Sequence, residues 1–342
     1  MTVWRIKNSC SRNSLDRERA ARRIEFAHPT LFIVHRGDKH ESMNRSSSVL
    51  SEFPWPRLPG SDEVPIWNGK SFRIGSSETE TLTFAQSDSA WSDDLTAMHE
   101  AEATSSHPMD LASRRLAVES MRESAGRPRS ILLDIGCSSG FLIQEIRRLF
   151  PSASALGADY LPGVVLKAAR RNPGTPFVQF DLRKCPLPDQ CIDGVTALNV
   201  LEHIDDDFTA LKEIYRILKP GGVAHVEVPA GPFCYDMYDE VLMHFRRYRL
   251  RDLAVLARNA GFIVERATHI GFLLYPAFVW VKQKNRRIGK RLAIEEKHRS
   301  VARQISRTAG SRVLRAVLGV ELLAAKLTTY PFGIRAVVRL RR

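Results

Sequence analysis

The sequence contains few cysteines, and they are not spaced as metal ligands. The five lie at positions 10, 137, 185, 191 and 234, without a C-x-x-C pair and without histidines at a matching spacing. This distribution disfavours both a disulfide framework and a cysteine-type zinc site. We therefore expect no metal site in this protein and a reducing compartment around it.

The sequence also lacks a hydrophobic run long enough to cross a membrane. The apolar, aromatic stretch at residues 271–281 falls well short of the roughly 20 residues that span a bilayer. The first 50 residues are rich in Arg, Ser, Asn and His and hold no apolar signal core. We expect a cytoplasmic protein whose residues 1–60 form a poorly ordered extension.

Two common phosphate-binding glycine motifs are missing as well. The apolar run 131–135 predicts a buried strand, the turn Gly136-Cys-Ser-Ser-Gly140 follows it, and a helix begins near Phe141. Ser138 and Phe141 occupy two of the glycine positions of G-x-G-x-x-G, and no Lys-Ser/Thr pair opens the helix as in a P-loop. The turn therefore fits neither a nicotinamide dinucleotide nor a nucleoside triphosphate.

The same turn does match the G-x-S-x-G nucleophile elbow of hydrolases, with Ser138 as the nucleophile. That elbow belongs in the middle of a sheet, after several earlier strands and an oxyanion-hole loop. Little before Ile131 has the pattern of a strand, so a serine hydrolase remains the less favoured alternative.

Acidic residues end the next strands of the predicted sheet. Residues 155–160 predict a strand that ends at Asp159, where a carboxylate can accept hydrogen bonds from both hydroxyls of a ribose. Residues 177–182 predict a strand that ends at Asp181, which could accept from an adenine amino group while Leu182 packs on the ring. No Lys or Arg lies between Asp134 and Ile143. A pyrophosphate ligand would be better served by the reverse balance of charge.

Together these features resemble the class I methyltransferases that use S-adenosylmethionine, over roughly residues 91–342. The glycine-rich first motif of that family resembles residues 134–140, with Ser138 where a glycine is common, and its fourth motif resembles residues 199–203. Leu218-Lys-Pro-Gly-Gly222 is similar to the turn before its fifth strand. The resemblance implies S-adenosylmethionine as the cofactor, bound by Asp134, Gly136, Cys137, Ser138, Gly140, Asp159, Tyr160, Asp181, Leu182 and Asn199.

The resemblance implies an α/β fold, a Rossmann-like, doubly wound sheet of seven mostly parallel strands with an antiparallel last strand. Hydrophobic periodicity predicts helices at 110–123, 208–218 and 250–260. Further strands are expected at 195–200, 223–228, 262–268 and 331–338, and a short strand or hairpin at 66–74. The domain would occupy 126–342 behind a lead-in at 61–125, with a C-terminal helical insertion at about 272–330.

The net charge of +13 is unevenly distributed. Residues 246–342 contain 23 basic and 5 acidic residues, a net charge of +18, whereas the rest of the chain carries −5. Residues 271–281 are followed by the cations Lys282, Lys284, Arg286, Arg287, Lys290 and Arg291. An apolar stretch of this kind can line a tunnel for an apolar substrate or lie in a membrane interface while the cations meet lipid headgroups.

A basic region can also bind nucleic acid or simply be a solvated helix face. The aromatic residues here are not interleaved with the cations as in stacking platforms, which argues against nucleic acid. We expect a small-molecule or lipid-linked acceptor and peripheral membrane contact through residues 271–300. The sequence favours no oligomeric state.

Two histidines are candidates for the catalytic base. Residues 236–248 contain His244 and Arg246-Arg247-Tyr248, and resemble a signature in one branch of small-molecule methyltransferases that includes quinone and cell-envelope glycan pathways. A neutral imidazole at His203 or His244 can accept the proton of an attacking hydroxyl. Either residue can equally be a loop anchor that hydrogen-bonds backbone. The sequence therefore predicts an enzyme that transfers a methyl group to oxygen. The other alternative is a catalytically inactive interaction protein with the same fold.

Overall fold

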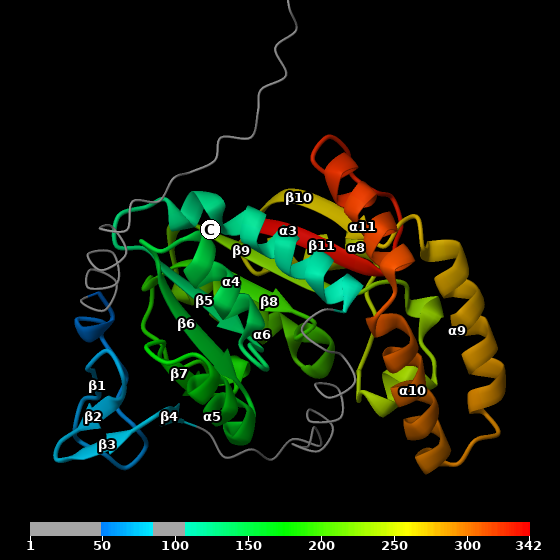
Figure 1. The fold of residues 1–342 in the computed structure, drawn as a ribbon. Helices are drawn as coiled ribbons and strands as arrows, with labels where there is room; N and C mark the ends of the chain where they lie inside the picture. The colour runs from blue at the N-terminus through cyan, green and yellow to red at the C-terminus, as the bar shows by residue number, and fades with distance from the viewer. Residues whose placement is uncertain (1–48, 85–106) are drawn as a thin grey trace, which may run out of the picture. The chain divides into compact units, whose positions relative to one another are not determined.

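The computed structural model describes residues 49–84 and 107–342 of the chain. A mostly parallel sheet lies at the centre of this region (Figure 1). Its strands are β4 (Leu82–Thr83), β5 (Ile131–Ile135), β6 (Ser154–Asp159), β7 (Phe177–Gln179), β8 (Ile192–Leu198), β9 (Leu218–Pro229), β10 (Ile263–Ile270) and β11 (Arg335–Arg341). The order is β10-β11-β9-β8-β5-β6-β7-β4, and β11 lies antiparallel between β9 and β10.

This topology confirms the predicted fold class and the antiparallel last strand. All seven predicted strands are present, and the two-residue strand β4 adds an eighth at the edge of the sheet by pairing in parallel with β7. Three strands begin three or more residues from the expected position: β8 starts at Ile192 instead of Val195, β9 at Leu218 instead of Val223, and β11 at Arg335 instead of Pro331. Strand order reverses between β5 and β8, and α/β sheets bind ligands at the carboxyl ends of strands at such a point.

Helices cover both faces of the sheet, as the strongly buried central strands require. They are α3 (Pro108–Ala125), α4 (Phe141–Leu149), α5 (Pro162–Arg171), α6 (Asp207–Ile217) and α8 (Leu250–Asn259). The first three pack with Leu132 on one face, and α6 and α8 belong to the core on the other face, which Leu133 joins. Strand β5 is therefore held from both sides, which fixes the turn that follows it.

The residues before the sheet fold against its core. Strands β1 (Ile66–Trp67), β2 (Phe72–Ile74) and β3 (Ser77–Thr79) form a small antiparallel sheet that includes the predicted hairpin. The expectation of poor order for residues 1–60 is wrong for 49–60, because Leu50, Phe53 and Trp55 are buried there. The Trp55 indole N–H donates to the Leu50 carbonyl at 2.9 Å. Residues 1–48 lie outside the described part of the chain, as does 85–106 of the predicted lead-in.

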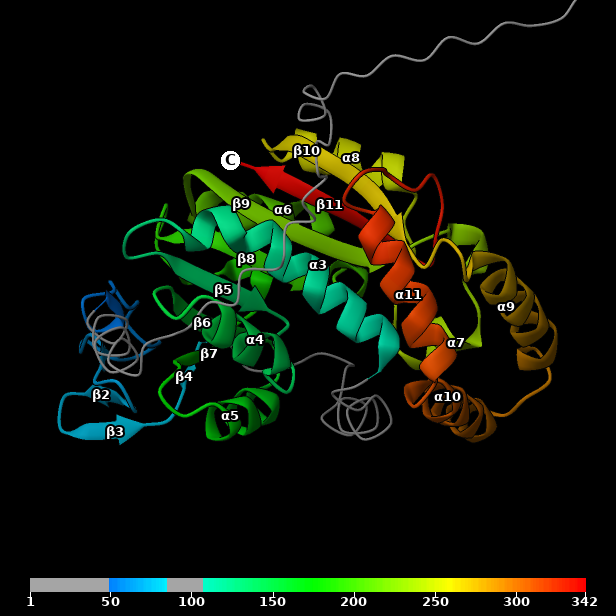
Figure 2. The ribbon, with the colours of Figure 1, turned by 45° about the horizontal axis from the view of Figure 1, so that its top comes forward.

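Three helices occupy the interval between β10 and β11, where the insertion was expected. They are α9 (Tyr275–Gly289), α10 (Ile294–Ala309) and α11 (Arg312–Ala324), and the short α7 (Met237–Val241) packs against α9 and α10. Figure 2 shows this group at one end of the sheet, with α11 beside α3. Within 49–84 and 107–342, no helix combines the length and the apolar character that a bilayer crossing demands.

Candidate active site

A cavity of about 800 Å³ lies at the carboxyl ends of the central strands. One wall is polar and comes from the ends of β5, β6, β7 and β8. The opposite wall comes from the C-terminal helices and is mostly apolar, with Leu274, Phe278, Val281, Ile305 and Leu318 among its residues. The sheet and the helical insertion therefore supply one half of the site each.

The turn after β5 is tight because three of its residues have left-handed backbone angles. Gly136, Ser138 and Gly140 have φ values of +69°, +46° and +73°. A Cβ atom on Gly136 would lie 2.5 Å from Cγ2 of Val200, and one on Gly140 would lie 2.3 Å from the Asn172 side chain. Both positions therefore require glycine, and the turn can approach a ligand with its backbone.

The structure brings two of the three predicted carboxylates to the cavity. Asp159 accepts a hydrogen bond from the Ser138 backbone N–H at 3.1 Å, so the acid at the end of β6 is joined to the turn after β5. Asp181 forms an ion pair with Arg183, which also pairs with Asp205. Burial opposes ionisation of Asp181, but the Arg183 hydrogen bonds and charge outweigh it and hold its pKa below the usual range. Tyr160 and Leu182 line the cavity beside these acids.

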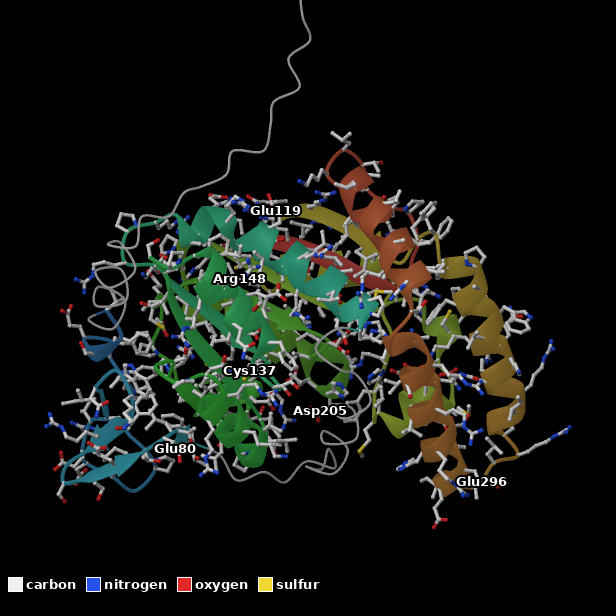
Figure 3. All side chains as sticks on the ribbon, viewed as in Figure 1. Glu80, Glu119, Cys137, Arg148, Asp205 and Glu296 are labelled. Carbon is white, nitrogen blue, oxygen red and sulfur yellow. The ribbon has the colours of Figure 1, made fainter. Side chains whose placement is uncertain are left out.

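Three predicted ligand residues are not among those that line the cavity. Asp134 is 3% exposed and accepts a hydrogen bond from Thr196 at 2.8 Å. Burial raises the pKa of Asp134 to about 7. Cys137 is buried, at the centre of the molecule in Figure 3, and Gly140 forms the N-cap of α4. Asp134 therefore has a supporting position beneath the turn, whereas Cys137 and Gly140 are part of the turn itself.

Asn199 and both candidate histidines line the same cavity. Asn199 has a φ of +53°, a conformation that asparagine tolerates better than most residues. His203 belongs to the short 3₁₀ helix η2 (Leu201–His203), and His244 lies after α7. Their rings meet edge to face with centroids 4.7 Å apart. The two histidines therefore form one group, although 40 residues separate them in the sequence.

A buried charge network behind His244 was not predicted from the sequence. The His244 Nδ1 atom lies 2.8 Å from Oδ1 of Asp239, and Arg247 donates to the same oxygen at 2.7 Å. Lys282 forms ion pairs with Asp236 at 2.7 Å and with Asp239 at 3.3 Å. Lys282 was expected among the cations that meet lipid headgroups, and this expectation is wrong, because the side chain is buried.

The network fixes the state of the His244 ring. Burial would raise the pKa of Asp239, but the hydrogen bond from His244 and the charges of Lys282 and Arg247 outweigh it and hold the pKa well below its usual range. Burial lowers the pKa of His244, against the opposing effect of Asp239. Because ionised Asp239 can only accept, Nδ1 of neutral His244 carries the proton and Nε2 keeps its lone pair.

Comparison with known proteins finds similarity to methyltransferases. A family model described as a methyltransferase domain matches residues 133–226, which run from β5 to β9. A probable S-adenosylmethionine-dependent methyltransferase from Mycolicibacterium smegmatis is 32% identical over 139 residues, 39% of this chain and 52% of the relative. A demethylmenaquinone methyltransferase from Thermus thermophilus is 34% identical over 128 residues, 36% of this chain and 57% of the relative.

The chain thus spans about half the length of these curated relatives. Among solved structures, a putative sarcosine dimethylglycine methyltransferase from Galdieria sulphuraria aligns with a TM-score of 0.48 at 14% identity. That alignment covers 73% of this chain and 98% of the other.

Proposed function

We propose that the protein is a class I methyltransferase that uses S-adenosylmethionine and transfers a methyl group to an apolar acceptor. The match of residues 133–226 to a methyltransferase domain model supports the first part of this proposal. The observation that carries the proposal is the two-sided cavity, polar at the strand ends and apolar at α9 and α11. When bound, S-adenosylmethionine supplies a methyl group activated by a cationic sulfur.

The polar wall has the chemistry that this cofactor needs. Asp159 accepts from the Ser138 N–H with one carboxylate oxygen and from the Leu161 N–H with the other. Each carboxylate oxygen can accept more than one hydrogen bond, so both can also accept from ribose hydroxyls. Asp181 and Leu182 line the cavity, and we infer that they contact the adenine amino group and ring face, although Arg183 shares the Asp181 carboxylate. Gly136 allows the close approach of the turn. Asp134 would act through the turn it supports.

The apolar wall favours an acceptor with a large hydrocarbon or aromatic part. Asn285, Gln304 and Thr308 also line this side of the cavity, but Leu274, Phe278, Val281 and Ile305 offer it no hydrogen-bonding side chain. An acceptor with an apolar part would cover these four residues, whereas a small polar metabolite would leave them in contact with water. The name of the Thermus thermophilus relative gives demethylmenaquinone, an apolar quinone, as its acceptor. We propose that the acceptor is lipid-linked or quinone-like and that its reacting hydroxyl oxygen lies beside His203 and His244.

The outer surface of the same helices suits a membrane interface. Trp280, Lys284, Arg287 and Ile288 follow helical spacing along α9 and are exposed, with Lys284 Nζ 5.8 Å from the Trp280 ring. Exposed Val313, Val320 and Leu323 recur on one face of α11. Such a mixture of apolar, aromatic and basic side chains binds the surface of anionic bilayers. A lipid acceptor would then enter the cavity from the membrane side.

Calorimetry with S-adenosylhomocysteine tests the cofactor half of the proposal. We expect one site per chain in the wild type and a Kd at least tenfold higher in Asp159→Asn, because hydrogen bonds to a charged group contribute about 1.5–3 kcal/mol. Glu295→Gln, an exposed acid on α10, is the matched control and should bind as the wild type does. Absence of binding to the wild type would overturn the proposal.

The acceptor half is tested by transfer of labelled methyl groups from S-adenosylmethionine into fractionated cell extracts. We expect the label in the lipid fraction and little in the water-soluble one. The reverse distribution would contradict an apolar acceptor. Labelling of Ser138 by a fluorophosphonate probe would instead favour the hydrolase alternative. The sheet order disfavours that alternative, because the edge strand β4 is the one described strand of the eight-stranded sheet that precedes β5 in the sequence.

A further inference from the structure

Three side chains with metal-binding atoms meet in the floor of the cavity. They are Glu202 and His203 from η2 and His244 from the segment after α7, and each offers one ligand atom within 4.8 Å of the other two. A backbone hydrogen bond from Phe245 N to Glu202 O, 2.8 Å long, ties the two segments together. The cluster is therefore held by the fold, and its members come from distant parts of the sequence.

Glu202 is the most unusual member of the cluster. Its side chain is fully buried, and neither carboxylate oxygen has a hydrogen-bond partner among the described residues. An unsatisfied buried carboxyl group is costly, and native proteins rarely keep one without a bound water or ion. The neighbouring acids Asp236 and Asp239 are already paired with Lys282 and Arg247. Glu202 is thus the carboxylate that the network leaves without a contacting cation.

His244 is oriented as metal-bound histidines usually are. Its Nδ1–H donates to Asp239, so the lone pair is on Nε2, the other ring nitrogen. Metal-ligating histidines commonly donate their second ring N–H to a carboxylate, which fixes the tautomer and the ring orientation. Asp239 plays that part here and is itself held by Arg247.

We propose that Glu202, His203 and His244 bind a divalent transition-metal ion such as Zn²⁺. Two imidazoles and one carboxylate are a known ligand set for catalytic zinc, with a fourth position open to water or substrate. Imidazole ligands favour such ions over Mg²⁺ and Ca²⁺, which prefer oxygen ligands. With bonds of about 2.1 Å, tetrahedral ligand atoms lie roughly 3.4 Å apart. The ligand atoms of the three side chains, which lie within 4.8 Å of one another, would therefore move closer by up to about 1.4 Å.

The open position would face the cavity, since all three residues line it. A hydroxyl oxygen of the acceptor bound there would release its proton to solvent more readily, because a bound cation lowers the pKa of an oxygen ligand. This consequence rests on the proposed function and would give His244 the part of a ligand instead of a base. The metal site itself rests only on the geometry of the three side chains.

Metal titration of the full-length protein tests the site. Protein treated with a chelator is titrated with Zn²⁺ by calorimetry and with Co²⁺ by visible absorption, which reports the ligand field directly. We expect one site in the wild type and at least 100-fold weaker binding in Glu202→Gln and in His203→Ala. His298→Ala, a histidine on α10 outside the cluster, should bind as the wild type does.

The design separates this inference from the proposed function. Glu202→Gln keeps the size and shape of the side chain, and its unfolding temperature without metal should match the wild type. Should it fail to fold, His203→Ala carries the same test. If the wild type binds S-adenosylhomocysteine but these substitutions do not weaken its metal binding, the metal site is overturned and the proposed function is not. Metal binding without S-adenosylhomocysteine binding would overturn only the proposed function.

Discussion

His225 shows how strongly the sheet interior acts on a titratable side chain. It lies on β9, fully buried, with Nδ1 2.8 Å from the Ser120 hydroxyl. Burial, assisted by the charge of Arg339, lowers its pKa from 6.5 to about 3. The folded protein therefore keeps the ring neutral at pH values where the unfolded chain binds a proton.

The free energy of unfolding should consequently fall below pH 6.5. The unfolded state gains a proton that the folded state excludes, so each pH unit between about 6.5 and 3 costs about 1.4 kcal/mol. His225→Gln removes the titrating group and should flatten this part of the profile. Urea denaturation at pH 7.5 and 5.5 measures the difference. If the wild type and His225→Gln lose the same free energy of unfolding between pH 7.5 and 5.5, His225 is not the cause of the pH dependence.

An ion pair joins three elements on the edge of the cavity. Arg335 at the start of β11 donates to Glu227 on β9 at 2.8 Å and to Asp110 on α3 at 2.9 Å. The Ser113 hydroxyl donates to the same Glu227 oxygen. Burial raises the pKa of Glu227, against the charge of Arg335, so this acid depends on its partner to stay ionised.

Arg335→Met should destabilise the protein by about 3–5 kcal/mol, because it leaves a buried carboxylate without its cation. The combination Glu227→Gln with Arg335→Met removes the charge on both sides and should recover much of that loss. Denaturation midpoints of the single and double variants provide the measurement. A double variant as unstable as Arg335→Met would mean that lost packing, and not the unpaired charge, dominates.

Strand β11 shows why its predicted boundaries, 331–338, differ from those in the structure, Arg335–Arg341. From Val338 on, buried apolar residues alternate with Arg339 and Arg341, and in the sequence these arginines indicate the end of a strand. In the fold, Arg339 and Arg341 pair with Glu123 of α3 and with Glu265 of β10. Charge compensation from other elements thus extends β11 to Arg341.

At the scale of the whole molecule, the strongly basic C-terminal quarter presents an exposed apolar and cationic surface on α9 and α11. We expect the protein to bind vesicles that contain anionic lipids and to leave neutral vesicles unbound. Binding should weaken as salt rises, because screening shortens the reach of surface charge. Flotation at low and moderate salt is the measurement.

A variant with reversed charges tests this surface without changing the buried charge network of Lys282. Lys284→Glu with Arg287→Glu should abolish flotation, whereas Arg129→Glu, an exposed cation before β5, should leave it unchanged. Lys282 is not used, since it belongs to the buried network. Flotation that persists in the first variant would contradict the proposed interface.

The sequence by itself determined the central sheet, the turn after β5 and the acids at the ends of β6 and β7, because hydrophobic periodicity and glycine placement are local signals. It also indicated the methyltransferase fold. Only the tertiary structure decided that Asp134 lies beneath the turn, that Lys282 is buried and that Glu202 and His203 meet His244. Burial and pairing arise when segments some 40 residues apart come into contact, and no local pattern records that contact.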